Sequence, residues 1–313
     1  MSTKTLLFTL VLVTAFSFFA FSVRRLILML RIGKADNRFD HPLLRLKRTI
    51  TVALGQTKLF REPVPGLMHA LIFWGFLILL IAVLEAIGEG LIPGFSLSVL
   101  GALYAPLVFL QDLFVGLVIV GVGYALFRRY VVHPKRLEVD RHGKIDATLI
   151  LVAILLIMVS MLGQNASGMT LSGIDHARFF AALFVPLFAG ANVQTVILTH
   201  EMFWWAHVIL VLGFLNYLPY SKHLHVLSSV PNVYFSSTKP RGALKPINLE
   251  EEGVEKFGAS DVEDLTWKQL LDGYTCTECG RCTSVCPANL TGKLLSPRKI
   301  IVDIRKRLTE KGP

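Results

Sequence analysis

Charged residues are scarce in this chain. Asp, Glu, Lys and Arg make up 17% of its 313 residues, whereas 53% are hydrophobic, and the mean hydropathy is +0.57. Soluble domains carry about 25% charged residues, so the composition excludes an ordinary soluble protein and favours one that contacts membrane lipid. The net charge is +10, but the basic residues lie in loops between apolar runs. That distribution indicates membrane topology, and we expect no nucleic-acid partner.

Cysteine is also rare, and all four cysteines fall in one stretch. Residues 276–287 read CTECGRCTSVCP, with the spacing C-x2-C-x2-C-x3-C-P. This spacing is typical of bacterial ferredoxins and predicts a 4Fe-4S cluster, and Gly280 permits the backbone to wrap around it. Crowding within so few residues argues against disulfides, and structural zinc usually takes two separated pairs. The predicted ligands are Cys276, Cys279, Cys282 and Cys286.

The sequence lacks the second cysteine run of a two-cluster ferredoxin. In such proteins the fourth cysteine of each run ligates the other cluster. Two alternatives follow for Cys286. It bends back and completes one cluster, or it serves a second cluster whose other cysteines come from elsewhere. We therefore expect that this chain is part of a longer protein, or that a partner subunit completes the site.

Five apolar runs are long enough to be transmembrane helices. Residues 24–65 hold ten Lys or Arg and residues 128–144 hold six, whereas residues 88–99 hold none and residues 163–199 hold one. Positively charged loops stay on the cytoplasmic side. We therefore expect a prokaryotic cytoplasmic membrane protein with its N-terminus outside and its C-terminus in the cytoplasm. The predicted spans are about residues 5–23, 66–87, 104–127, 145–162 and 200–218.

A further apolar stretch, residues 179–188, is broken by Pro186 and is expected to lie on the outer surface without crossing. After Val230 the composition becomes that of a soluble domain. Three prolines predict an extended linker arm over residues 231–259. Ser260 and Glu263 have the spacing of a capping box, which would open a helix leading to the cysteines. Behind them, Ser296 followed by Pro297 predicts the start of a last helix.

The predicted fold class is therefore all-α. A five-helix transmembrane bundle occupies residues 1–230, and a small α-helical ferredoxin-like domain in the cytoplasm occupies residues 260–313.

Two histidines lie at similar depth, at the predicted inner ends of the second and fifth spans. His69 lies just inside the inner end of the second span, and His225 lies just past the inner end of the fifth. Neutral imidazoles on facing helices are ordinary haem ligands, so the pair predicts a haem b; the alternative is two interfacial polar residues. His207 lies 18 residues before His225, five turns at 3.6 residues per turn, so both share a face if the helix persists through Pro219.

His207 lies deeper, in the outer half of the fifth span, where an imidazole is expected to be functional. It would ligate a second haem with an unidentified partner such as His176, or contact a quinone. His200, Glu201 and Asp112 near the same outer end are candidates for quinone and proton contacts, with ordinary headgroup contact as the alternative. Cations of residues 24–65 are candidate partners for the haem propionates.

These spans and histidines resemble the nitrate reductase gamma subunit family of membrane cytochromes b. The stretch HVILVLGFLNYLPYSKHLH, residues 207–225, is the most specific part, and the resemblance covers about residues 1–230. It implies that His69 and His225 hold the haem nearer the cytoplasm and that His207 matches a ligand of an outer haem. Leu79 stands where the partner of His207 would be, which departs from the family pattern.

The tail, about residues 260–310, resembles the iron–sulfur domain of heterodisulfide reductase D-like proteins. Fusions of this kind include electron-transfer-flavoprotein:menaquinone oxidoreductases. In them a second cysteine quartet and a cysteine-rich catalytic domain follow, and neither is present in this sequence.

The first functional hypothesis is a membrane redox subunit, the electron-transfer part of a quinone-linked oxidoreductase. It would pass electrons between a cytoplasmic partner, carrying a cysteine-rich or flavin domain, and the membrane quinone pool through the 4Fe-4S cluster and haem b. The second hypothesis is a membrane-anchored iron–sulfur protein without haem that acts as a redox sensor or anchor. An enzyme acting alone on a disulfide is disfavoured, because the cluster uses every cysteine.

Overall fold

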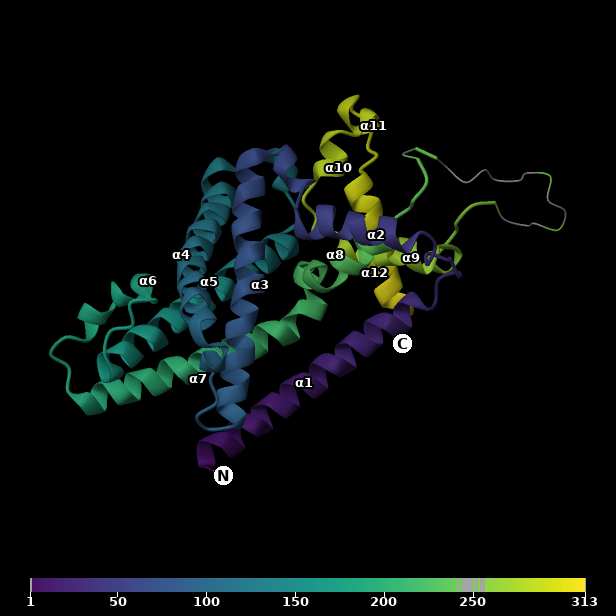
Figure 1. The fold of residues 1–313 in the computed structure, drawn as a ribbon. Coiled ribbons are helices and arrows are strands. Elements are labelled where there is room, and N and C mark those ends of the chain that lie inside the picture. The colour runs from purple at the N-terminus through teal and green to yellow at the C-terminus, as the bar shows by residue number, and fades with distance from the viewer. Residues whose placement is uncertain (1, 241, 244–249, 251–252, 254–256, 313) are drawn as a thin grey trace. The chain divides into compact units, whose positions relative to one another are not determined.

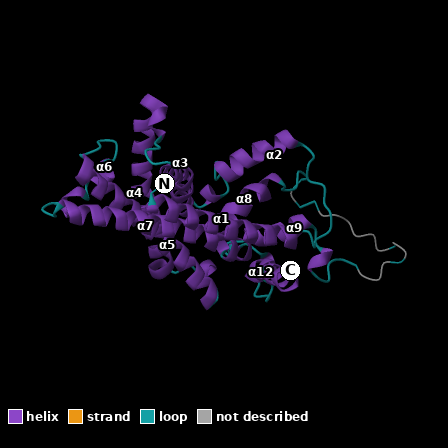
Figure 2. Cartoon of the chain, turned by 90° about the horizontal axis from the view of Figure 1, so that it is seen from below, coloured by secondary structure: helices purple, strands orange, loops and turns teal. Residues whose placement is uncertain are grey.

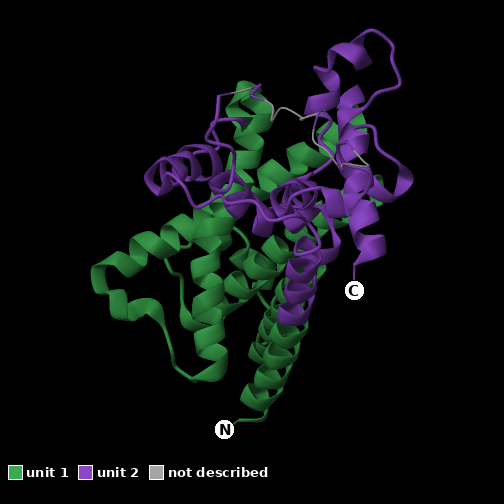
Figure 3. Cartoon of the chain, turned by 90° about the vertical axis from the view of Figure 1, so that its right-hand side faces the viewer, with its two compact units in different colours: residues 1–18, 59–133, 144–217 green, residues 19–58, 134–143, 218–313 purple. Residues whose placement is uncertain are grey.

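The computed structural model describes residues 2–240, 242–243, 250, 253 and 257–312. Over these residues the secondary structure is helical, joined by loops and turns (Figures 1 and 2). The chain forms two compact units, coloured separately in Figure 3. Unit 1 comprises Met1–Phe18, Leu59–His133 and Lys144–Tyr217, and unit 2 comprises Phe19–Lys58, Pro134–Gly143 and Leu218–Pro313.

Five helices are long and apolar enough to cross a membrane, by length and composition. They correspond one to one with the five predicted spans, and α4 has the predicted bounds. Others are longer: α5 continues to Ser172, not Leu162, because residues 163–172 are helical although many of their side chains are small or polar. The five helices are α1 (Thr3–Leu30), α3 (Pro63–Leu91), α4 (Tyr104–Phe127), α5 (Arg141–Ser172) and α7 (Val193–Tyr217).

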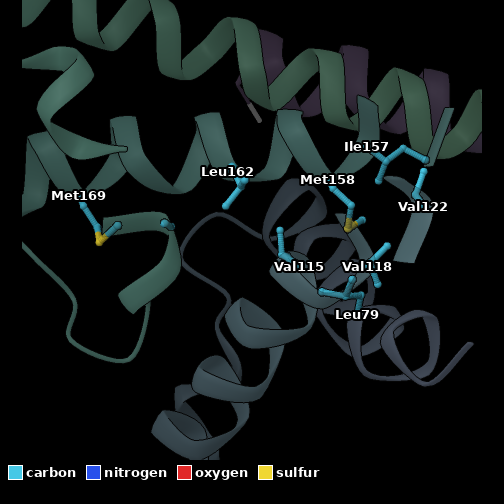
Figure 4. Packing of buried hydrophobic residues seen from close by; sticks show 9 residues of the cluster. Leu79, Val115, Val118, Val122, Ile157, Met158, Leu162 and Met169 are labelled. Carbon is cyan, nitrogen blue, oxygen red and sulfur yellow. The ribbon is translucent and has the colours of Figure 1, made fainter. Parts of the chain in front are cut away.

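Unit 1 has a core between α3, α4 and α5. Val115, Val118 and Val122 line one face of α4 and pack with Leu79 of α3 and Met158 of α5 (Figure 4). A second cluster joins α1 to α7 through Phe8, Leu12, Trp204, Val208 and Leu212.

The short helices α6 (Phe179–Ala182) and η6 (Val185–Phe188) follow α5, and Ala181 is buried in the first core. These two helices form the segment that is expected to lie on the outer surface. Each is too short to cross a bilayer, which needs about 20 helical residues.

Unit 2 is built from short helices around an apolar cluster. Leu270, Leu271 and Tyr274 of α9 and Leu308 of α12 pack with Met29. The remaining helices of both units are α2 (Pro42–Arg48), η1 (Thr49–Leu54), η2 (Leu59–Arg61), η3 (Leu97–Leu103), η4 (Arg128–Val132), η5 (Lys135–Leu137), η7 (Leu218–Tyr220), η8 (Lys222–Leu224), α8 (His225–Tyr234), η9 (Val262–Asp264), α9 (Trp267–Thr275), α10 (Arg281–Ser284), α11 (Pro287–Leu290) and α12 (Pro297–Lys311).

The helix starts of unit 2 differ in part from the predicted ones. Thr266 and Gln269 form the capping box of α9, and Asp261 and Asp264 form another on η9, so the predicted Ser260–Glu263 pair is wrong. An aspartate caps as well as a serine does, and several candidates lie within a few residues. The predicted cap of the last helix is confirmed, because the Ser296 side chain accepts from the Lys299 amide.

The linker arm begins later than predicted. Helix α8 runs through Pro231 to Tyr234, with the proline inside the helix, where it lacks only its own amide as a donor. Most of residues 241–256, in the middle of the predicted arm, lie outside the described residues.

Candidate functional site

The four cysteines lie on a compact loop between α9 and α11. Cys276 caps the end of α9, Cys282 lies in α10 and Cys286 precedes α11. All four are free thiols, with Cys282 exposed and the other three partly buried. The loop therefore presents four thiols that are available as ligands.

Gly280 fixes the path of this loop. Its φ of 72° is left-handed, and a Cβ atom on it would overlap the carbonyl oxygen of Arg136. Arg136 also donates from Nη1 to the carbonyl of Cys279 at 3.0 Å. Arg298 in turn donates to the Arg136 carbonyl at 2.9 Å. Only glycine allows the loop to approach this arginine so closely.

Cations contact the backbone of the loop at more than one point. Besides Arg136, Arg305 of α12 donates from Nη1 to the Cys276 carbonyl at 2.9 Å. Four thiolates on a cubane leave the cluster with net negative charge, and nearby cations stabilise such charge. Burial raises the pKa of the Cys276 thiol, and Arg305 opposes that shift. Metal ligation overcomes such a shift, because the metal binds the thiolate.

The donor set fits an iron–sulfur cluster better than a single ion. Within the described part of the chain, no three His, Cys, Asp or Glu side chains converge as ligands of one metal ion. In a cubane each thiolate binds a different iron, so the thiolates need not converge on one point. Four free cysteines, a left-handed glycine and flanking arginines are therefore compatible with a cluster, and the assignment of Cys276, Cys279, Cys282 and Cys286 as its ligands stays a prediction.

Glu278, between the first two cysteines, was not singled out from the sequence. Its carboxylate forms ion pairs with Lys222 at 3.2 Å and with Arg305 at 2.5 Å. The side chain is only 13% exposed. Burial opposes ionisation, but the two cations outweigh it and lower the pKa of Glu278. Its backbone φ of 58° is also left-handed, which is uncommon for a residue other than glycine.

His225 stands at the start of α8, where its ring is oriented by the backbone. Its Nδ1 lies 3.1 Å from the carbonyl oxygen of Lys222. A carbonyl can only accept, so Nδ1 carries the hydrogen and the lone pair is on Nε2. Metal-ligating histidines almost always show this arrangement. Burial lowers the pKa of His225, which favours the neutral ring that ligation needs.

The helical argument that linked His207 to His225 is wrong. Helix α7 ends at Tyr217, and two short 3-10 helices, η7 and η8, precede His225. Pro219 lies in the first of them, and proline in a helix interior breaks the hydrogen-bond ladder. Five continuous turns therefore do not connect the two rings.

His207 and His200 repeat one arrangement on α7. His207 Nδ1 donates to the carbonyl of Ile157 at 3.2 Å and lies 3.0 Å from Ser160 Oγ. His200 Nδ1 makes the same two contacts one heptad away, to the Gln164 carbonyl at 3.1 Å and to Oγ of Ser167 at 3.2 Å. Both rings thus carry their lone pair on Nε2. The serines escaped notice in the sequence, although their seven-residue spacing matches that of the histidines.

His69 and His176 are the remaining candidate histidines. His69 is partly buried on α3 and belongs to unit 1, whereas His225 belongs to unit 2. Their pairing at one haem therefore stays a prediction. His176, the suggested partner of His207, is exposed in the loop after α5.

The two carboxylates among the quinone and proton candidates, like His200, have structural partners. Asp112 is buried on α4 and accepts hydrogen bonds from the amides of Phe180 and Ala181, so it caps α6. Glu201 pairs with Lys4 at 2.7 Å, and the same lysine lies 4.1 Å from the centroid of the Trp204 ring. These contacts suffice to explain why both side chains are polar.

Cations of residues 24–65 are likewise used within the protein, and Arg45 is the most buried of them. Arg45 is 1% exposed and pairs with the carboxylate of Asp40. It also donates to the carbonyls of Asp40, Tyr234 and Ser236. A guanidinium with these acceptor contacts has little capacity left for a haem propionate.

Comparisons with known proteins agree with the cysteine loop and the apolar helices. The chain is 34% identical over 98% of its length to a probable iron-sulfur-binding oxidoreductase, FadF, of Bacillus subtilis. It is 30% identical over 88% of its length to an EtfAB:quinone oxidoreductase of Syntrophomonas wolfei. These similarities support a membrane-anchored iron–sulfur oxidoreductase. The chain covers 43% and 40% of these two relatives, less than half of each.

A third relative matches a shorter part of the chain. A probable membrane-anchored ferredoxin of Chromohalobacter salexigens is 39% identical over 61 residues, 20% of this chain. No protein-family profile matches the chain. No solved structure matches it either.

Proposed function

We propose that this chain is the membrane electron-transfer part of a quinone-linked oxidoreductase. The observation that carries the proposal is the four-cysteine loop with its arginine contacts, in a chain with five apolar helices. Electrons would pass between a cytoplasmic iron–sulfur or flavin partner and the quinone pool. Iron–sulfur electron transfer also agrees with the names of the relatives.

Haem b is proposed as the second redox centre, with His69 and His225 as its ligands. The hydrogen bond from His225 Nδ1 to the Lys222 carbonyl supports this role, because it presents Nε2 as a ligand atom. Together the cluster and the haem would supply one-electron carriers at the cytoplasmic side. The resemblance to membrane cytochromes b is the further support.

A quinone is proposed to bind near the His200 and His207 side chains. Each ring is held by a serine hydroxyl and a carbonyl of α5, so each Nε2 can accept a hydrogen bond from a quinol or a proton. The name of one relative includes quinone oxidoreductase. Asp112 and Glu201 would then stabilise the surroundings through α6 and Lys4.

The test is an optical redox titration of the full chain purified in detergent, with its iron and sulfide contents. We expect reducible b-type bands in addition to a 4Fe-4S signal. His69→Ala and His225→Ala should each abolish the haem bands and keep the cluster. His142→Ala, which changes an exposed histidine at the start of α5, is the matched control and should keep both.

The alternative function gives a different result. A membrane-anchored ferredoxin without haem would show the cluster alone, with identical spectra for all three variants. Absence of haem bands in the wild-type protein, after expression with haem supplied, would contradict the proposed electron-transfer function.

A further inference from the structure

Lys222 contacts both proposed redox sites of unit 2 with different parts of the same residue. Its ammonium pairs with Glu278 on the cysteine loop at 3.2 Å. Its backbone carbonyl accepts the hydrogen bond from His225 Nδ1 at 3.1 Å. A displacement of the cysteine loop would therefore reach the ring that we propose as a haem ligand.

The Glu278–Lys222 pair is well shielded from water. The side chains are 13% and 10% exposed, and Arg305 provides the second cation of the cluster of charges. Burying such charges costs much of what their attraction gains, so a buried pair is weak evidence of added stability. Breaking such a pair is nevertheless destabilising, because removing one partner leaves the other charge buried and uncompensated, so the pair favours the one arrangement in which both partners meet.

The backbone conformation of Glu278 also indicates that its ion pair favours one arrangement of the cysteine loop. A left-handed φ of 58° would be adopted more easily by glycine, yet a glutamate occupies the position. The carboxylate is what glycine lacks, and it pairs with Lys222 and Arg305. A second hydrogen bond connects the same two segments. Thr275 Oγ1 donates to Ser228 Oγ at 3.1 Å and so joins the residue before Cys276 to α8.

We propose that Glu278 is a positioning residue that locks the cysteine loop to the segment carrying His225. The role of this contact in electron transfer between the cluster and the haem rests on the proposed function. One electron leaves one centre and reduces the other, and no proton is needed for that transfer. By holding Lys222, Glu278 keeps the two sets of ligands in one arrangement while the electron passes.

The test compares Glu278→Gln, Lys222→Met and the double variant in the purified full chain, reconstituted with its cluster. Hydrogen exchange is measured over residues 222–228 and 276–280. We expect exchange at residues 222–228 to be about tenfold faster in both single variants, the effect of losing one charged hydrogen bond. The double variant should be no faster than either single one, because each removes the same contact.

Lys299→Met is the matched control. It removes an exposed pair with Asp303 on α12, the helix that also carries Arg305, and should leave exchange at residues 222–228 unchanged. Lys222→Met also keeps the test decisive if Glu278→Gln prevents cluster insertion, because Lys222 lies outside the cysteine loop.

A redox measurement distinguishes a loss of ligand positioning from the electrostatic effect of removing one charge. In haem-containing protein, loss of position predicts the same change in the ferric haem EPR signal in both single variants. It also predicts cluster-to-haem electron equilibration slower by about tenfold, the usual size of the effect of losing a residue that orients a metal ligand. Shifts of haem potential that are opposite in sign and additive, without faster exchange, would overturn the proposal. If the wild type binds no haem, the proposed function fails, while the exchange comparison still decides whether Glu278 couples the two segments.

Discussion

Gly280 shows how one residue type decides the path of the cysteine loop. The position combines a left-handed φ with contact to the Arg136 backbone. Any residue with a Cβ atom would therefore pay both a conformational and a steric energy cost. Left-handed backbone alone costs an L-residue about 1–2 kcal/mol. The overlap with a carbonyl oxygen adds to this, because backbone cannot rotate away as a flexible side chain can.

Gly280→Ala should therefore lower the amount of cluster bound per chain and destabilise unit 2. Gly292→Ala is the control, since Gly292 is also left-handed but a Cβ atom on it would meet nothing within 4 Å. Iron and sulfide contents of the two purified variants measure the difference. Equal cluster contents in both variants would show that the Arg136 contact does not shape the loop.

The histidines illustrate a second effect at the residue scale. A ring nitrogen becomes a suitable ligand when the other nitrogen donates to a fixed acceptor. His225, His207 and His200 all meet this condition through backbone carbonyls. The sequence shows where the imidazoles are along the chain, but not which nitrogen carries the hydrogen.

At the scale of elements, α12 is attached to η9 by partly exposed ion pairs. Asp261 accepts from Arg307 at 2.9 Å and from Lys311 at 2.8 Å. Asp261 also caps η9, so one carboxylate joins two helices that flank the cysteine loop in the sequence. The hydrogen bonds from Arg307, then Lys311, hold the pKa of Asp261 well below its ordinary value.

This attachment predicts a pH dependence of stability. Because the pKa of Asp261 is lower in the folded state, the unfolded state takes up its proton first as the pH falls. The contribution is therefore complete above about pH 4, the pKa of an unfolded aspartate, and is lost as the pH decreases below it. Asp261→Asn should make the thermal midpoint of unfolding fall less steeply between about pH 5 and pH 3 than it does in the wild type, by circular dichroism in detergent.

Asp303→Asn is the control for this experiment, because its pair with Lys299 lies within α12 and joins no other element. An Asp261→Asn profile that runs parallel to the wild-type profile would show that this attachment does not contribute.

At the scale of the whole molecule, the cation distribution predicts how the chain crosses the membrane. The basic segments 24–65 and 128–144 alternate along the chain with the cation-poor segments 88–99 and 163–199. The five apolar helices, three of them between these segments and one at either end, are long enough to cross a membrane each time the alternation requires it. We therefore expect the cysteine loop on the cytoplasmic side.

Reporter fusions test this topology. Alkaline phosphatase should be active when fused after Phe95 and inactive when fused after Lys135, and a cytoplasm-dependent fluorescent reporter should give the opposite pattern. Phosphatase activity at both sites would contradict the five-span arrangement and place the cysteine loop differently.

The sequence by itself determined the helices and the candidate cluster ligands. Apolar runs of membrane length and a short cysteine spacing are local patterns, so they can be recognised without knowing how the rest of the chain packs. Caps were predicted less well: Ser296 is right, whereas Thr266 and Asp261 replace Ser260, because neighbouring polar residues compete for the same free amides.

Only the tertiary structure decided which polar residues act together. Glu278 meets Lys222, and Ser160 meets His207, across 56 and 47 residues of sequence. The fold also assigned Asp112 to a helix cap and ended α7 before His225. Such contacts depend on how helices pack, and the side chains of a single sequence carry no local pattern that specifies a distant partner.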